Sequence, residues 1–289
     1  MGGAYFERVP RAAECEFCCG RQSGMSLSPD VEAIYCISLQ EQPYRTQAAV
    51  AHFHALGLCR EMTLYRPVRG RHANRAIWES HRAVAQHALR AGLSRVLVLE
   101  DDVLFTDPRE RLISRVRAAL AKLPTNWWVF YLGHVPIQAF FVRWNILRVR
   151  SGCTHAYIAN QPMLRWLAAT APMAAEAPVW RWIGQSIDAA MSSLPQMYAL
   201  FPMVAVQRYL GDYRVDTRVD DQGRRRSFTD VDRWRYLFIF AKGARFAEAM
   251  AVLLSPVHRL TLERSRRQVA KSARRGATVD HTIAPERVP

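Results

Sequence analysis

Four aliphatic residues followed directly by three acids, VLVLEDD, are the feature that most limits how this chain can fold. The aliphatic run is Val96–Leu99, and the acids are Glu100–Asp102. A short, unbroken aliphatic run is typical of a strand that is buried on both faces, as strands are inside parallel sheets. The apolar residues of 73–93 recur at helical spacing, and Gly92 is a good C-terminal stop. A helix that leads directly into a buried strand indicates an α/β fold.

Two further strands are expected upstream of this helix. The β-rich run AIYCISL predicts a strand at residues 33–39, and MTLYRPV predicts another at 62–68. Between them a helix is expected at about residues 46–58, and Pro43 with its polar neighbours indicates a loop before that helix. Strands and helices in alternation predict a parallel α/β unit.

The three acids are expected at the carboxyl end of their strand. Ligands of open α/β sheets bind outside the carboxyl ends of the strands. An unpaired buried carboxylate costs several kcal/mol, so the acids should face solvent or a cation, and a divalent metal is a suitable partner. A helix cap or a solvated turn is the alternative, although Asp107 is better placed to cap the helix expected at residues 107–120.

Six cysteines are unevenly placed, with Cys15, Cys18 and Cys19 in the first twenty residues. No secretory signal is recognisable, so we expect reduced thiols in a cytoplasmic protein. A zinc knuckle needs a second cysteine or histidine pair at a suitable spacing. We find no such pair after the first cysteines, and we expect no zinc site.

The formal net charge is +15, and arginines crowd two stretches near the C-terminus, DQGRRRS and LERSRRQVAKSARRG. Such charge suits a polyanionic partner, and a nucleic-acid-binding protein is therefore one alternative. Three acids at a strand end argue against that surface as the binding face. No window reaches about 18 uninterrupted apolar residues, so we expect a protein without a transmembrane helix, either soluble or peripheral to a membrane.

We divide the chain into four parts. Residues 1–30 are expected to be an irregular segment, and the 24 residues before Met25 to be dispensable. The α/β domain should occupy residues 31–220, followed by a helical extension at 221–260 and a basic, disordered tail at 261–289. Within the extension, a helix over residues 232–260 would either pack on the domain or lie at the interface of an anionic membrane.

A series of motifs then resembles glycosyltransferase family 25, which includes bacterial lipopolysaccharide sugar transferases and collagen galactosyltransferases. In order, the motifs are AIYCISLQEQPYR, ESH, VLVLEDDV, WVFYLG, GCTHAYIA and ALFPMVAVQ. They run from about Ile34 to Asp212. Two features depart from the family pattern: Arg75 and Ala76 stand where a Gly-Cys pair is common, and EQPYR replaces an arginine-rich RRPDR segment.

The resemblance implies a GT-A type fold, a Rossmann-like mixed sheet with flanking helices, and a nucleotide-sugar donor. It implies transfer of a hexose, galactose from UDP-galactose in the first place, to a saccharide or hydroxylated acceptor. A bound Mn²⁺ or Mg²⁺ would neutralise the charge that develops on the diphosphate leaving group. Hard carboxylate ligands favour these two ions over zinc.

Alternation along an extended chain would place Glu100 and Asp102 on one side and Asp101 on the other. We therefore expect Asp102 to be a direct metal ligand, with Glu100 close to the metal or the donor sugar. Asp101 should anchor the loop or the ribose. The resemblance makes Arg45 a candidate for contact with the donor nucleotide or diphosphate, although a solvated loop arginine is an equal alternative.

Five other residues are candidates through the resemblance. Ser80 and His81 lie on the helix before the acidic strand and could reach the donor, although a helix histidine is often structural. His155 is expected to contact substrate or metal, and Tyr157 lies in the same segment unless it is a core residue. Asp188 is the candidate catalytic base for an acceptor hydroxyl; an ordinary helix carboxylate is the competing interpretation.

A second enzymatic hypothesis keeps the acids and the metal but assigns phosphoryl or nucleotidyl transfer, which also uses carboxylate-held Mg²⁺. The chain lacks a GxxxxGK[ST] loop, which weakens the P-loop version of this hypothesis.

Overall fold

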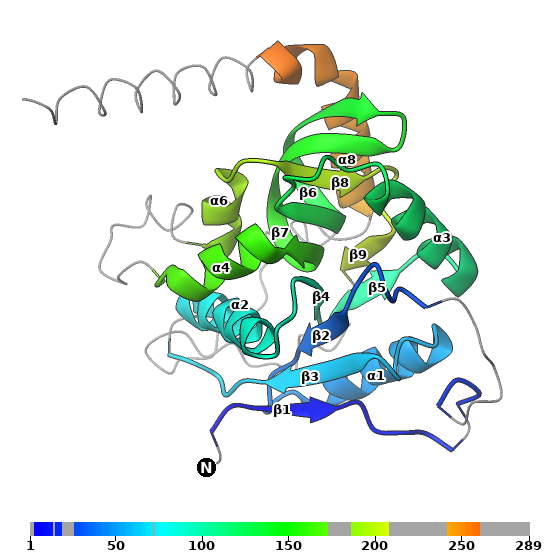
Figure 1. The fold of residues 1–289 in the computed structure, drawn as a ribbon, viewed down its shortest axis with the longest axis vertical. Coiled ribbons are helices and arrows are strands. Elements are labelled where there is room, and N and C mark those ends of the chain that lie inside the picture. Colours follow the sequence, from blue (N-terminus) through cyan, green and yellow to red (C-terminus); the bar gives the residue numbers. More distant parts are fainter. Residues whose placement is uncertain are drawn as a thin grey trace, which may run out of the picture.

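The computed structural model describes residues 3–13, 15–18, 26–71, 73–172, 186–207 and 242–260. A seven-stranded mixed sheet in the order β1-β3-β2-β4-β7-β6-β8 runs through the described part, with helices on both faces (Figure 1). The strands are β1 (Tyr5–Arg8), β2 (Ala33–Ile37), β3 (Met62–Arg66), β4 (Arg95–Glu100), β6 (Val129–Arg143), β7 (Ile146–Asn160) and β8 (Met197–Leu200). The short strands β5 (Val103–Phe105) and β9 (Ala205–Gln207) form a separate antiparallel pair. The helices are α1 (Pro43–Ala55), α2 (Ala73–Arg90), α3 (Arg109–Leu120), α4 (Gln161–Ala169), α6 (Ile187–Ser192) and α8 (Lys242–Leu253).

The parallel centre of the sheet is formed by the three strands that the sequence predicts. β2 lies between β3 and β4 and is parallel to both. The helices α1 and α2 form the two crossovers, as expected for a parallel α/β unit. The loop expected before α1 is present at residues 38–42, but the helix begins at Pro43, three residues earlier than expected. Proline is well suited to the first turn of a helix, where its missing N–H has no intrahelical partner.

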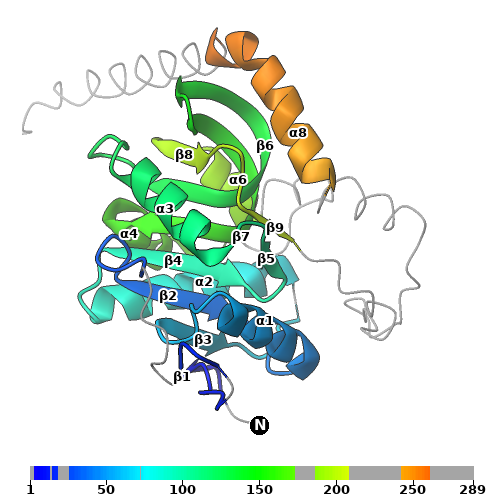
Figure 2. The same cartoon turned by 90° about the vertical axis from the view of Figure 1, so that its right-hand side faces the viewer.

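Alternating side chains of β4 enter two different apolar layers, which confirms a strand buried on both faces. Leu97 and Leu99 belong to the layer that contains residues of α1 and α3. Val96 and Val98 belong to the layer covered by α2, α4 and α6. The helices that cover the two layers lie on opposite sides of the sheet, α1 and α3 on one side and α2, α4 and α6 on the other (Figure 1 and Figure 2).

Strand direction changes next to β4. β7 pairs antiparallel with β4, and β6 pairs antiparallel with β7 in a long hairpin with several register shifts. β8 then returns parallel to β6. A parallel centre joined to antiparallel strands, with helices on both faces, confirms the α/β class and is consistent with the GT-A-type, Rossmann-like fold expected from the sequence.

The N-terminal segment is not wholly irregular. β1 pairs antiparallel with β3 along the sheet edge, and Val9 and Cys15 are buried in the core. These contacts argue against the expectation that the residues before Met25 are dispensable. The same segment places Cys15 and Cys18 against His54 and Cys59, a second pair of possible metal ligands that their spacing along the chain does not reveal.

Helix α3 differs from expectation at its start. Its N-cap residue is Pro108, with no side-chain cap. Asp107 was expected to be the cap, but its Oδ2 instead accepts a hydrogen bond from Nη1 of Arg115, two turns into the helix. A long arginine can reach back along the helix and take the carboxylate that would otherwise cap it.

Helix α8 packs against β6 (Figure 2). Glu248 and Ala251 form its buried side, and Glu248 accepts hydrogen bonds from the backbone N–H of Met203. The packed helix that was one of two alternatives is therefore present at 242–253. Residues 208–241 and 261–289, including the two arginine-rich stretches, lie outside the described residues. Among the described helices, none combines the length and the apolar character that a bilayer span requires.

Candidate functional site

The candidate site lies where β2, β3 and β4 end side by side. Their polar terminal residues are Ser38 directly after β2, Arg66 at the end of β3, and Glu100 at the end of β4. Asp101 and Asp102 follow in the turn before β5. We call Glu100, Asp101 and Asp102 the acidic centre. Its place at the carboxyl ends of parallel strands is the one predicted from the sequence.

An arginine from the first turn of α1 holds two of these acids. Nη2 of Arg45 lies 2.5 Å from Oδ1 of Asp101 and 3.1 Å from Oδ2 of Asp102. The hydroxyl of Ser38 donates a 2.9 Å hydrogen bond to the other oxygen of Asp101. Asp101 and Asp102 are 6% and 8% exposed, so the expectation that the acids face solvent is wrong for these two. The arginine compensates their burial.

Alternation did not assign the sides of the acids correctly. Asp101 and Asp102 were expected on opposite sides, yet both contact Arg45. The reason is that β4 ends at Glu100 and the next two residues form a turn, where the period of two no longer applies. Arg45 was predicted to contact the donor, and its proximity to the acidic centre keeps that prediction open.

Asp102 has the features of a metal ligand. Its Oδ2 accepts from Nε2 of Gln207 at 3.4 Å, whereas its Oδ1 is buried and has no hydrogen-bond partner among the described residues. Burial raises the pKa of Asp102 to about 7, and the negative charges of Glu100 and Asp101 act in the same direction against Arg45. A cation at Oδ1 would satisfy the unpaired oxygen, so the residues present fit a bound Mn²⁺ or Mg²⁺.

Glu100 connects the acidic centre to a second group of polar residues. Its Oε1 accepts a 3.0 Å hydrogen bond from the hydroxyl of Thr154 and lies 3.6 Å from Nε2 of His81. Burial acts to raise the pKa of Glu100, but His81, His155 and Thr154 outweigh it and hold the pKa below its ordinary value. Its side chain keeps 26% of its surface exposed. Glu100 is therefore an ionised carboxylate that solvent or substrate can reach.

Asp188 is brought to the same place from a distant part of the chain. It lies in the first turn of α6, where Ser186 caps the helix by accepting from the N–H of Ala189. Burial raises the pKa of Asp188 to about 6, and the charge of Glu100 adds to this effect. Oδ1 of Asp188 is buried without a hydrogen-bond partner among the described residues. Two neighbouring carboxyl groups with pKa values shifted in opposite directions are a common arrangement in catalytic sites.

The other candidates occupy supporting positions. Nδ1 of His81 lies 2.8 Å from the hydroxyl of Tyr157, and both side chains are buried beneath Glu100. The hydroxyl of Ser80 donates to the carbonyl of Ala76 one turn earlier in α2. Burial lowers the pKa of His155, although the charge of Glu100 opposes this shift. His155 is thus a buried neutral imidazole close to the acidic centre.

Gly133 in β6 gives His155 the room it needs. A Cβ atom at this position would collide with Nε2 of His155 and with the backbone carbonyl of Ala205. The glycine of the WVFYLG motif therefore allows β6 and β9 to approach each other directly behind the site.

We expect Gly133→Ala to lower the free energy of unfolding by about 1–3 kcal/mol, because backbone and a buried ring must move apart to admit the methyl group. Chemical denaturation of the variant checks this. Gly152→Ala is a suitable control, since nothing lies within 4 Å of the position of its Cβ. Equal stability of the two variants would contradict the close approach.

Ser38, Thr46 and Arg66 were missed from the sequence. Nη1 of Arg66 donates to the hydroxyl of Ser38 at 3.0 Å and also to the hydroxyl of Thr46, and Ser38 in turn holds Asp101. The available signal was position, because Ser38 follows β2, the parallel neighbour of β4, and Arg66 ends β3, the next strand along the sheet. Polar residues at such ends converge even when no motif contains them.

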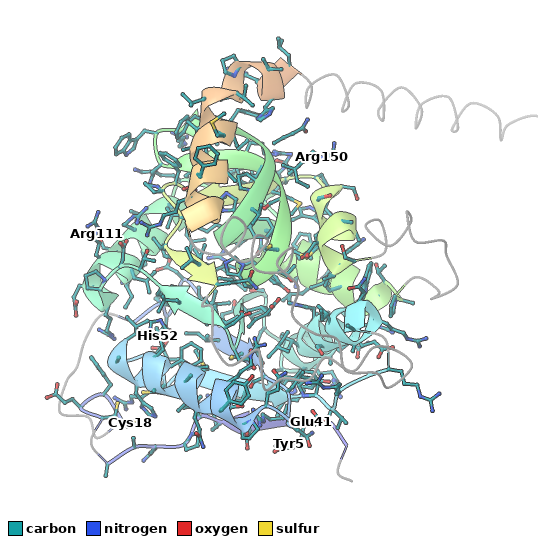
Figure 3. The ribbon with its side chains drawn as sticks, turned by 180° about the vertical axis from the view of Figure 1, so that it is seen from behind. Tyr5, Cys18, Glu41, His52, Arg111 and Arg150 are labelled. Carbon is teal, nitrogen blue, oxygen red and sulfur yellow. The ribbon has the colours of Figure 1, made fainter. Side chains whose placement is uncertain are left out.

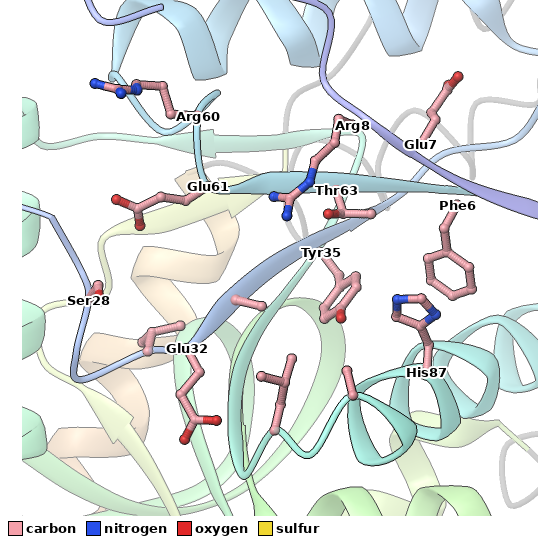
Figure 4. A pocket seen from close by; sticks show the side chains of 14 residues that line it. Phe6, Glu7, Arg8, Ser28, Glu32, Tyr35, Arg60, Glu61, Thr63 and His87 are labelled. Atoms are coloured by element: carbon pink, nitrogen blue, oxygen red, sulfur yellow. The ribbon is translucent and has the colours of Figure 1, made fainter. Parts of the chain in front are cut away.

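A cavity of about 630 Å³ lies elsewhere, at the amino ends of β2 and β3 (Figure 4). Its lining includes Arg8, Tyr35, Thr63 and His87, and the His87 ring stacks on Phe6 with centroids 4.0 Å apart. None of the sequence-predicted site residues lines it. The chemistry-bearing residues are at the opposite ends of these strands, so this cavity is not the candidate site.

No protein family model matches this chain, and no curated protein matches its sequence. Solved structures that are distantly similar to this chain include the following three. A197 from STIV is 14% identical with a TM-score of 0.38, covering 62% of this chain and 86% of that chain. A glycosyltransferase involved in the glycosylation of the major capsid of PBCV-1 is 10% identical, with a TM-score of 0.31 over 47% of this chain and 63% of that one. Apo-UDP-glucose pyrophosphorylase is 7% identical, with a TM-score of 0.35 over 58% and 72%. These likenesses assign no family, so family 25 remains a resemblance carried by the sequence motifs.

Proposed function

We propose that this chain is a metal-dependent glycosyltransferase that moves a hexose from a nucleotide sugar to a hydroxyl group of a saccharide or another hydroxylated acceptor. The observation that carries the proposal is that Asp188 and Glu100 interact at the carboxyl ends of the parallel strands. The buried ion pair of Asp102 and Arg45 lies beside them. This arrangement supplies a base, an ionised carboxylate and a cation site in one place. UDP-galactose is the donor that the motif resemblance favours.

In this mechanism Asp188 accepts the proton of the acceptor hydroxyl as that oxygen attacks the sugar. A base must lie within hydrogen-bond reach of the attacking oxygen, and Oδ1 of Asp188 has no hydrogen-bond partner among the described residues. Glu100 remains ionised and, held by Thr154 and His81, faces the donor sugar. Its negative charge opposes ionisation of Asp188, which makes that carboxylate a stronger base.

Asp102 through Oδ1, together with Glu100, would hold Mn²⁺ or Mg²⁺. The ion, when bound, supplies positive charge that stabilises the diphosphate leaving group. Arg45 adds a second positive charge at the same strand ends and keeps Asp102 oriented. Ser38 donates a hydrogen bond to Asp101 and accepts one from Arg66, which restrains the turn that carries Asp102.

A donor screen tests the proposal. The protein with Mn²⁺ is incubated with a panel of nucleotide sugars, and the released nucleoside diphosphate is measured, with nucleoside triphosphates compared by calorimetry. We expect binding and slow release with at least one UDP-sugar. Binding of triphosphates but of no nucleotide sugar would favour the nucleotidyl-transfer alternative and reject the glycosyltransferase. Salt-sensitive nucleic-acid binding that survives loss of the acids would favour the binding protein.

We also propose that α8 attaches the protein to an anionic membrane. The surface of α8 opposite its buried side carries an apolar stripe of Phe246, Met250 and Leu253, all exposed. The exposed Arg245 lies on the same helix, and the exposed Arg259 follows the helix along the chain. An apolar helix face bordered by basic residues is typical of a helix that lies in a membrane interface.

Replacing Phe246 and Leu253 together by glutamate should abolish sedimentation with anionic liposomes without lowering the melting temperature, because neither side chain is buried. Ala121→Glu, at an exposed position at the end of α3, adds the same kind of charge away from the stripe and should leave sedimentation unchanged. Liposome binding by the double variant at the level of the unmodified protein would disprove the attachment.

A further inference from the structure

Four side chains that the sequence separates into two pairs converge beneath the N-terminal segment. Cys15 and Cys18 come from that segment, and His54 and Cys59 come from the C-terminal end of α1 and the turn after it. The nitrogen and sulfur atoms of the four residues all lie within 4.8 Å of one another. Figure 3 shows Cys18 beside α1. We call these residues the thiol cluster.

The end of α1 is shaped to bring His54 and Cys59 together. The N–H of Gly57 bonds to the carbonyl of His54, and the N–H of Leu58 bonds to the carbonyl of Phe53. Gly57 has a φ of +66°. This is the Schellman pattern of helix termination, which requires a left-handed residue and reverses the chain. The reversal returns Cys59 to the side of the helix that carries His54.

The N-terminal pair is also arranged locally. The backbone N–H of Cys18 points at Sγ of Cys15, with a distance of 3.4 Å between nitrogen and sulfur. Phe17, one of the two residues between them, packs under the guanidinium of Arg109 in α3, whose carbon lies 4.9 Å from the ring centroid. A turn with two thiols three residues apart and an amide directed at the first sulfur is suited to holding a metal ion.

Two of three distances within the thiol cluster are close to those of tetrahedral zinc coordination, and the third is shorter. Sγ of Cys15 lies 3.7 Å from Sγ of Cys59, which in turn lies 3.2 Å from Sγ of Cys18. Sγ of Cys18 lies 3.4 Å from Nδ1 of His54. With zinc–sulfur bonds of about 2.3 Å and zinc–nitrogen bonds of about 2.0 Å, a tetrahedron requires roughly 3.7 Å between sulfurs and 3.5 Å between sulfur and nitrogen.

We propose that Cys15, Cys18, His54 and Cys59 bind one Zn²⁺ as a structural site. Four protein ligands fill the tetrahedron and leave no position for a substrate, which distinguishes a structural from a catalytic zinc. Thiolates and imidazole select zinc, whereas the carboxylates of the acidic centre select Mg²⁺ or Mn²⁺. Binding releases the thiol protons to solvent, with no change of oxidation state.

The zinc would fasten the N-terminal segment to the helix that serves the candidate site. The segment includes β1, the edge strand of the sheet. Helix α1 carries a zinc ligand near its last residue and Arg45 in its first turn, where that arginine holds Asp101 and Asp102. The metal therefore fixes the far end of the element that positions this arginine.

Metal analysis of the purified full-length protein tests the site. Prepared under reducing conditions without chelators, it should contain about one zinc per chain. Cys18→Ser and Cys59→Ser should each lose this zinc almost completely. Cys36→Ala is the matched control, because Cys36 is a buried cysteine of β2 outside the cluster and its loss should leave the zinc content unchanged.

Cobalt titration keeps the test decisive if a serine variant fails to fold. The unmodified apoprotein should bind Co²⁺ with the intense visible absorption of a tetrahedral, thiolate-rich site, and an equivalent of zinc should remove it. His54→Cys should retain metal binding and His54→Ala should lose it. Absence of both zinc and a tetrahedral cobalt spectrum in the reduced protein would overturn the proposal. So would finding four rather than six reactive thiols after denaturation without reductant, since the cluster would then hold a disulfide.

Discussion

Asp188→Asn is expected to reduce sugar transfer by about 10²–10⁴-fold, the usual contribution of a general base, while nucleotide-sugar affinity stays nearly unchanged. Asparagine keeps the shape of the side chain and can still accept hydrogen bonds at the start of α6, but it cannot take a proton from the acceptor. Steady-state rates and calorimetric donor affinities measure the two effects separately. If the variant loses donor affinity instead, Asp188 belongs to the donor or metal site and is not the base.

The pH profile provides an independent readout of the same residue. Burial and the charge of Glu100 raise the pKa of Asp188 to about 6, so the carboxylate is mostly protonated below that pH and mostly ionised above it. The transfer rate of the unmodified enzyme should therefore rise as pH increases through about 6. Asp188→Asn should lack this rise, whereas Asp30→Asn, which removes a partly exposed partner of Arg117, should retain it.

Asp102→Asn is expected to weaken Mn²⁺-dependent donor binding by about 100-fold or more. Loss of a second-shell partner commonly costs 10–100-fold in metal affinity, and the loss of a ligand should cost at least as much. The amide removes the negative charge that attracts the cation. Because burial of the Asp102 carboxylate is unfavourable and raises its pKa to about 7, replacing it by a neutral amide should change the free energy of unfolding little. Calorimetry with and without Mn²⁺ measures the effect.

Asp101→Asn is the matched control, because it changes the neighbouring carboxylate in the same turn. Asp101 binds Arg45 on one oxygen and Ser38 on the other, so we expect its role to be structural. The control should lower the melting temperature and leave the dependence of donor binding on Mn²⁺ intact. Unchanged Mn²⁺ dependence in the Asp102 variant would exclude Asp102 as a ligand, and loss of it in the control would move the ligand role to Asp101.

Some features of the acidic centre depend on residues that are neighbours in the sequence, and others depend on the tertiary structure. Its position at the end of a buried parallel strand could be predicted, because an aliphatic run followed by acids is a pattern of neighbouring residues. The orientation of its members could not, because a turn begins after Glu100 and both aspartates turn towards Arg45 of α1. The exact residue at which a strand ends is the least certain part of a sequence-based prediction.

The sequence by itself determined the α/β class, the three parallel strands and the helices between them, since periodicity and end signals act within a few residues of chain. Tertiary structure alone decided that Asp188 lies beside Glu100 and that His54 and Cys59 complete the pair begun by Cys15 and Cys18. These contacts depend on how β7, α6 and the N-terminal segment pack. Packing brings together residues that are far apart in the sequence, and no periodic sequence pattern predicts such contacts. The chemistry of both sites arises from such long-range contacts, for which the sequence supplies the residue types and the fold supplies the distances.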